Sequence, residues 1–238
     1  MIDYGLLMSV IVAWAASSLA IRMHQPDTYD SPVSVSDVLL IPGFAGLVVG
    51  RVSTLALDDP RAIGSISDLI VIRSGVEFWP AVAAAALMVA WSARRTDVHP
   101  VARVSALAPV AMVAYGAYEA ACLFRDGCYG PPTPMVLTPE GLSTPMLPVG
   151  ILVGASAIGA AVLVRRLDER GWPSGAVVSA AVASIGLISS IGSVWLPKVG
   201  GGLSRQHRTS IVITLLAGLT TGALLMLDAR STTERATP

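Results

Sequence analysis

The sequence predicts an all-α polytopic membrane protein with about seven transmembrane helices. Of its 238 residues, 53% are hydrophobic and 13% are charged, and the mean hydropathy is +0.67. Soluble domains carry roughly 25% charged residues, so this chain has about half the usual charge for covering a water-exposed surface. Seven apolar stretches are long enough to cross a bilayer core about 30 Å thick, which takes roughly 20 residues of helix.

The expected spans cover residues 4–21, 35–57, 78–93, 101–124, 147–165, 174–196 and 209–227. Because no stretch between them resembles a soluble domain or a repeat, we expect a single integral membrane domain over residues 1–238. The first span has the length of a signal peptide, but its first residues carry Asp3 and no basic side chain, so we expect a retained helix. The third span is the shortest, and the apolar run 66–72 before it suits a re-entrant or interfacial segment.

Small residues fill the expected spans, and aromatic residues make up only 5% of the chain. In a membrane, small residues allow two helix backbones to approach closely. Pairs of glycines at GxxxG spacing occur in three spans: Gly46/Gly50, Gly150/Gly154 and Gly218/Gly222. We expect each pair to mark a contact between helices.

The basic residues indicate an orientation, because cytoplasmic loops carry an excess of Lys and Arg. Nine fall in the loops after the first, third and fifth spans and in the C-terminal tail, against seven on the other side. This bias places the N-terminus outside and the C-terminus in the cytoplasm. The arginines on the outer side then either bind a phosphate head group or extend to ordinary lipid head groups.

Composition also excludes several classes of function. Sixteen Lys and Arg balance sixteen Asp and Glu, so the chain lacks the basic excess that a nucleic-acid-binding protein needs. Two cysteines cannot form a disulfide scaffold, and three scattered histidines suggest no zinc site. We therefore expect no metal, no cofactor and no nucleic-acid partner.

Ionisable side chains inside spans are costly in lipid and are therefore candidate site residues. Arg51 lies in the second span, and Glu119 lies late in the fourth on one helix face with Tyr115 and Cys122. An ion pair between Arg51 and Glu119 would neutralise both charges, in either a structural or a catalytic role. His207 precedes the last span and is either a general acid or base or an ordinary surface histidine.

Cys122 and Cys128 fall at the expected outer end of the fourth span. An exoplasmic location permits a disulfide between them, and a turn at Cys128 would bring the two thiols together. Their spacing alone leaves this bond open. The loop that follows, over residues 125–146, is rich in proline and glycine, which favour turns over helix.

Several short motifs follow one another in the order found in one family of membrane enzymes. The motifs are Gly50-Arg51 with the later Asp59-Pro60, the segment Cys128 to Thr133, and Gly202-Leu203-Ser204 before the last span. In these motifs and in its seven spans the chain resembles the prolipoprotein diacylglyceryl transferases. Enzymes of this family transfer diacylglyceryl from phosphatidylglycerol to a protein cysteine at the outer leaflet, which begins bacterial lipoprotein maturation.

The resemblance implies a multi-pass protein of the bacterial inner (plasma) membrane, a membrane phospholipid as partner and a site for its phosphate. The arginines implied for that site are Arg51, Arg125 and Arg205. The residues implied for the loop over the site are Cys128, Tyr129 and Gly130.

The chain departs from the family at positions that carry chemistry. Trp79 stands where the family has a histidine, Glu119 stands where it has its signature arginine, and the late Arg/Glu pair falls near Ser189 and Ser193. The sequence therefore leaves open a diverged transferase, with Glu119 and His207 as candidate catalytic residues, and a non-catalytic protein that binds lipid. A third alternative is a structural subunit of a larger complex, with other membrane protein subunits as partners.

Overall fold

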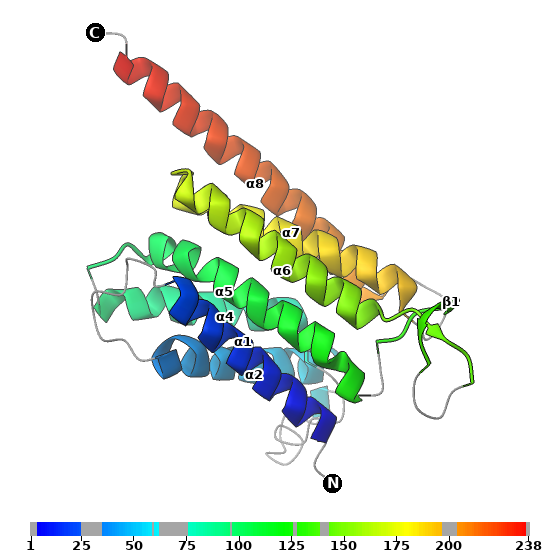
Figure 1. Ribbon diagram of the computed structural model, residues 1–238. Coiled ribbons are helices and arrows are strands. Elements are labelled where there is room, and N and C mark those ends of the chain that lie inside the picture. Colours follow the sequence, from blue (N-terminus) through cyan, green and yellow to red (C-terminus); the bar gives the residue numbers. More distant parts are fainter. Residues whose placement is uncertain are drawn as a thin grey trace. The chain divides into compact units, whose positions relative to one another are not determined.

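The computed structural model describes residues 4–24, 35–58, 60–61, 76–95, 97–125, 128–138, 143–196 and 204–236. The α-helices of this part of the chain are α1 (Tyr4–His24), α2 (Val35–Asp58), α4 (Phe78–Ser92), α5 (Pro100–Ala120), α6 (Val149–Glu169), α7 (Ser174–Trp195) and α8 (Arg205–Ala236). Two 3-10 helices, η3 (Ala93–Arg95) and η4 (Ala121–Arg125), extend α4 and α5, and a strand, β1 (Pro132–Leu137), follows η4 (Figure 1). The all-α prediction is confirmed.

Five helices of the described residues are long and apolar enough to cross a membrane. Their candidate spans are Leu39–Asp58, Pro100–Phe124, Val149–Glu169, Ser174–Trp195 and Arg205–Ser231. Shorter apolar helices lie over Leu7–Met23 and Phe78–Ser92. Each of the seven expected spans thus coincides with one helix, and the polytopic helical character is confirmed. The count of seven crossings and the orientation of the termini stay predictions, and the run 66–72 lies outside the described residues.

The chain packs as two compact units. The larger unit contains Met1–Gln25 and Ser105–Pro238, and the smaller unit contains Pro26–Val104. Helix α5 therefore begins in the smaller unit and continues through the larger one. Whether the two units form one integral membrane domain, as the sequence suggests, stays a prediction.

In the smaller unit, α2 packs closely against the start of α4. A Cβ atom on Gly46 would lie 2.8 Å from the carbonyl oxygen of Ala81, and one on Gly50 would lie 2.8 Å from that of Glu77. The backbone N–H of Glu77 donates to the carbonyl of Gly50 (3.1 Å) and to Oγ1 of Thr54 (2.9 Å). This first glycine pair does mark a helix contact, because neither position has room for a side chain.

In the larger unit, a second glycine pair brings α6 against α5 and η4. A Cβ on Gly150 would lie 2.6 Å from the carbonyl oxygen of Glu119, and one on Gly154 would overlap the carbonyl oxygen of Gly116. By contrast, a Cβ on Gly218 or Gly222 of α8 would meet nothing within 4 Å among the described residues. Among the described residues the expected helix contact at this third pair is therefore not formed.

Hydroxyl groups inside the helices bond mainly to their own helix. The hydroxyls of Ser17, Ser92, Ser184 and Ser190 donate to carbonyl oxygens three or four residues earlier, at 2.7–3.0 Å. This local bond satisfies a polar group without help from another helix. It explains how the spans hold many serines in an apolar environment.

Candidate functional site

The segment between η4 and α6 folds back on itself at one end of the larger unit. The backbone N–H of Gly130 donates to the carbonyl of Leu147 (2.8 Å), and that of Thr133 donates to the carbonyl of Pro145 (2.9 Å). Figure 1 shows β1 near the end of α7. We call this region the disulfide end of the larger unit, because it also carries the only two cysteines of the sequence.

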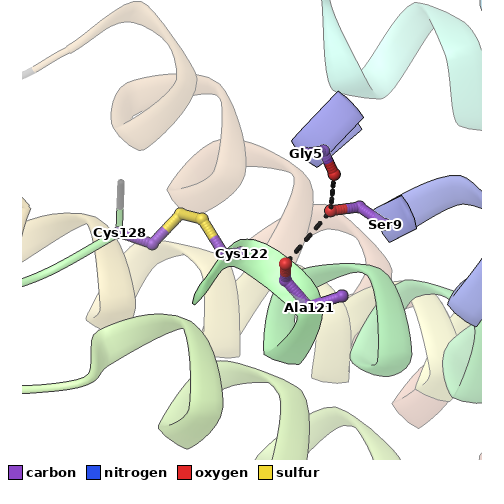
Figure 2. Close-up of a disulfide and its surroundings, with 5 residues drawn as sticks. All are labelled: Gly5, Ser9, Ala121, Cys122 and Cys128. Carbon is purple, nitrogen blue, oxygen red and sulfur yellow. Dashed lines mark hydrogen bonds between the residues drawn. A yellow bond between two sulfur atoms is a disulfide. The ribbon is translucent and has the colours of Figure 1, made fainter. Parts of the chain in front are cut away.

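A disulfide joins Cys122 of η4 to Cys128, with the Cα atoms 6.0 Å apart (Figure 2). Cys122 is 2% exposed, so the bond lies inside the unit. Cys128 has φ of 64°, in the left-handed region that few residues other than glycine adopt. The backbone N–H of Gly150 donates to the carbonyl of Cys128 (3.2 Å), which attaches the start of α6 to the same turn.

Helix α1 reaches the same end through one buried serine. The Ser9 hydroxyl lies 2.9 Å from the carbonyl of Gly5 and 3.1 Å from that of Ala121, the residue before the disulfide (Figure 2). A hydroxyl has one proton, so the two carbonyls share it. The first turns of α1 are thus fixed beside η4.

The residues implied for the loop over the site lie at the disulfide end of the larger unit. Gly130 is buried, and a Cβ there would lie 2.8 Å from a methyl carbon of Val149 and 3.2 Å from the carbonyl oxygen of Trp195. Tyr129, its neighbour, is half-buried. Because only glycine fits at position 130, the loop can lie directly on the start of α6 and the end of α7.

His207 lies in the first turn of α8 at this end, and its side chain is buried, with 8% of the residue exposed. Its backbone N–H donates to the hydroxyl of Ser204 (3.1 Å), which caps the helix. Its ring Nδ1 lies 2.6 Å from the hydroxyl oxygen of Ser193 on α7. The structure therefore places this histidine inside the helix packing, and the surface alternative is wrong.

A second hydroxyl pair connects α7 to α5. Tyr115 and Ser189 lie with their hydroxyl oxygens 3.0 Å apart. Ser189 and Ser193 are four residues apart in α7 and so lie on the same face of that helix. We call Tyr115, Ser189, Ser193 and His207 the polar row. Its pairing was not expected from the sequence, in which the only signal was the two serines at helical spacing.

The three arginines implied for the phosphate site come from three different elements: α2, η4 and α8. Arg205 is exposed at the start of α8, two residues before His207. Arg125 ends η4, and its side chain lies outside what the structure describes. Arg51 is buried in α2 of the smaller unit, with 4% exposed, whereas Glu119 belongs to the larger unit. A phosphate role for these arginines, and a pairing of Arg51 with Glu119, stay predictions.

Comparison with known families decides which proteins the chain is related to. A family model for prolipoprotein diacylglyceryl transferase matches residues 2–228, nearly the whole chain. The chain belongs to this family. No curated protein matches it significantly. The suspected family is confirmed, and with its apolar helices the chain is a multi-pass membrane protein of the lipoprotein-biosynthesis type.

Two residues at which the sequence suggests a departure from the prolipoprotein diacylglyceryl transferase family lie among the described residues. Trp79, for which the resemblance implies a histidine in the family, is buried in the first turn of α4, and its ring makes a T-shaped contact with Phe78 (centroids 5.0 Å apart). Glu119, for which the resemblance implies an arginine, is half-buried one turn after Tyr115. Both correspondences stay predictions. Among the described residues no group of three or more His, Cys, Asp or Glu could hold a metal ion. The polar row contains a buried imidazole in contact with a serine hydroxyl, an arrangement that can hold or move a proton.

Proposed function

We propose that the protein transfers a diacylglyceryl group from phosphatidylglycerol to the thiol of a protein cysteine, at the outer leaflet of a bacterial inner membrane. The family match over residues 2–228 supports this class of reaction. The observation that carries the proposal for this chain is the buried His207, held by Ser193 at 2.6 Å. An imidazole titrates near neutral pH and is the side chain best suited to accept a thiol proton.

In the proposed reaction, His207 accepts the proton of the substrate thiol. The thiolate then attacks the glycerol carbon that carries the phosphate ester. A carbon–sulfur bond forms, the carbon–oxygen bond to phosphate breaks, and glycerol phosphate leaves with the bonding electrons. The proton on the imidazole then passes to the departing phosphate, so that proton and charge balance.

The departing phosphate needs positive charge near the imidazole. Arg205 supports this role, since it lies two residues before His207 at the start of α8. The partial positive charge of a helix N-terminus also favours an anion there. Arg51 and Arg125 are proposed as further phosphate ligands on the basis of the family resemblance, with Tyr129 and Gly130 closing over the site.

Complementation tests the proposal directly. In cells depleted of their own transferase, we expect the chain to restore diacylation of lipoproteins, and His207→Gln and Arg51→Ala to abolish this rescue. His99→Gln is the matched control, because His99 is exposed and lies outside the polar row. Absence of rescue despite normal amounts in the membrane would refute the transferase proposal. Rescue by His207→Gln would remove this residue from the mechanism.

A second candidate function is binding of phospholipid without catalysis. The residues Glu119 and Trp79 argue against catalysis, because a carboxylate cannot stabilise a departing phosphate and an indole cannot act as a base. Native mass spectrometry from a mild detergent tests this second function. This function predicts retained phospholipid, and more of it in Glu119→Gln, whereas protein without any bound lipid would reject it.

A third candidate function is that of a structural subunit in a larger membrane complex. A pull-down of the chain at native expression should then recover partner proteins, and recovery of this chain alone would exclude that role.

A further inference from the structure

Ser193 makes two short polar contacts whose protons can be counted. Its hydroxyl oxygen lies 2.6 Å from Nδ1 of His207 and 2.8 Å from the carbonyl oxygen of Ser190 in the preceding turn. A serine hydroxyl has one proton to donate, and a carbonyl oxygen has none. The contact between Ser193 and the Ser190 carbonyl is therefore a hydrogen bond only if the Ser193 hydroxyl donates its proton to that carbonyl.

In the alternative arrangement, the Ser193 hydroxyl donates its proton to Nδ1 of His207 instead. The two oxygen atoms, 2.8 Å apart, would then face each other with no hydrogen between them. Lone pairs at that distance repel, and this cost is not screened in an apolar interior. When Ser193 donates to Ser190 and accepts from Nδ1, each contact contains a hydrogen. Nδ1 of His207 then carries the ring proton.

We propose that Ser193 is a positioning residue that holds neutral His207 in the Nδ1-protonated tautomer and so leaves Nε2 as the proton acceptor. The bond made by one ring nitrogen decides which tautomer a buried histidine adopts. The backbone is fixed too, because Ser204 caps the first turn of α8. When Nε2 accepts a proton, Nδ1 keeps its hydrogen and its bond to Ser193, so the ring need not turn during proton transfer.

Helix α7 contains a matched control for this role. The Ser184 hydroxyl donates to the carbonyl of Ala180 at 2.8 Å, the same kind of bond to a preceding turn that Ser193 makes. Ser184 is also partly buried on the same helix. It differs from Ser193 in lying outside the polar row. Any effect of losing a serine hydroxyl from α7 in general should therefore appear in Ser184→Ala as well.

Nitrogen NMR measures the tautomer without any need for activity. The full-length chain, labelled with ¹⁵N-histidine in lipid nanodiscs, contains three histidines, and His207→Gln identifies the signals of His207. Above the titration range of the ring, we expect a protonated Nδ1 and a bare Nε2. Ser193→Ala should shift the ring towards the Nε2-protonated form, while Ser193→Thr and Ser184→Ala should keep the original pattern. A wild-type ring protonated at Nε2 would overturn the proposal, even if Ser193→Ala failed to fold.

The catalytic consequence rests on the proposed transferase function and has its own measurement. A positioned general base contributes about 10²–10⁴-fold to a rate. We expect Ser193→Ala to lower the transfer rate at least about tenfold, as part of that contribution. Ser193→Thr should restore most of the rate, and Ser184→Ala should not lower it. If the NMR result holds but no variant of the protein shows transfer, the tautomer assignment stands and the transferase function fails. An equal loss in Ser184→Ala and Ser193→Ala would reject the specific role of Ser193 in the rate.

Discussion

Replacing Gly150 by alanine tests how closely α6 packs against the end of α5 and the start of η4. The added methyl carbon would lie 2.6 Å from the carbonyl oxygen of Glu119 and 3.0 Å from Cβ of Cys122. Real Cβ atoms essentially never approach another heavy atom closer than 3.0 Å, so α6 and the end of α5 must separate by about 0.4 Å at this point. The carbonyl cannot rotate away, because it is part of the helix backbone, and the disulfide restrains Cys122.

Overpacking of this kind costs typically about 1–3 kcal/mol. Alanine also favours helix over glycine by roughly 0.5–1 kcal/mol, which would partly hide that cost. Gly159→Ala is the control for this gain in helix propensity, because Gly159 lies on the same helix and a Cβ there would meet nothing within 4 Å among the described residues. We therefore expect Gly150→Ala to be about 1–3 kcal/mol less stable than Gly159→Ala, because both variants share the gain in helix propensity.

The assay is reversible unfolding of the two variants by SDS in mixed micelles, followed by the change in helical circular dichroism. The quantity compared is the free energy of unfolding. Equal stability of the two alanine variants would refute the close approach of α6 to the end of α5. A loss in both variants would instead show that α6 does not tolerate alanine for a reason other than this contact.

Three other changes test separate contacts by the same unfolding measurement. Cys128→Ser removes a disulfide between residues six apart, and the chain-entropy model gives a loss of about 2 kcal/mol in the free energy of unfolding. A reductant should lower the free energy of unfolding of the wild type by the same amount and leave that of the variant unchanged. Ser105→Ala removes a hydroxyl that donates to Asp168 Oδ1 at 3.1 Å, and we expect a loss of about 1 kcal/mol, whereas no loss would show that the bond is not formed. Tyr115→Phe removes the bond to Ser189 at 3.0 Å and should cost about 0.5–1.5 kcal/mol, with no further cost in the double variant that also carries Ser189→Ala.

The positions of the helices could be predicted from hydropathy, but some of their ends could not. The last span was expected over 209–227, whereas α8 extends over Arg205–Ala236. A hydropathy window stops at polar residues, while backbone hydrogen bonds continue through them. Helix α6 likewise continues four residues past its expected end, where Arg165 and Glu169 form an ion pair at 2.6 Å. It stops before Gly171, whose φ of 77° ends the helical path.

The candidate site was only partly predictable, because it depends on how helices meet. His207 could be singled out as a titratable residue beside a span, but its bond to Ser193 depends on how α7 and α8 pack together. The spacing of Cys122 and Cys128 is compatible with a bridge or with free thiols, since it does not determine how the chain turns. Glycine spacing was similarly ambiguous: the pair in α6 lies against a neighbouring helix, whereas a Cβ at either glycine of the α8 pair would meet no described residue within 4 Å.

The hydroxyls that bond within their own helix have a consequence for biosynthesis. A helix whose serines already bond to its own carbonyls exposes few unsatisfied polar groups to lipid. Such a helix can therefore pass from the translocon into the bilayer without a partner helix. The bond of Ser193 to His207 cannot form at that stage, because α8 is made after α7 and every earlier helix. The imidazole therefore meets its partner only when the last helix docks, and a ribosome-bound chain that lacks α8 would sit in the bilayer without this site.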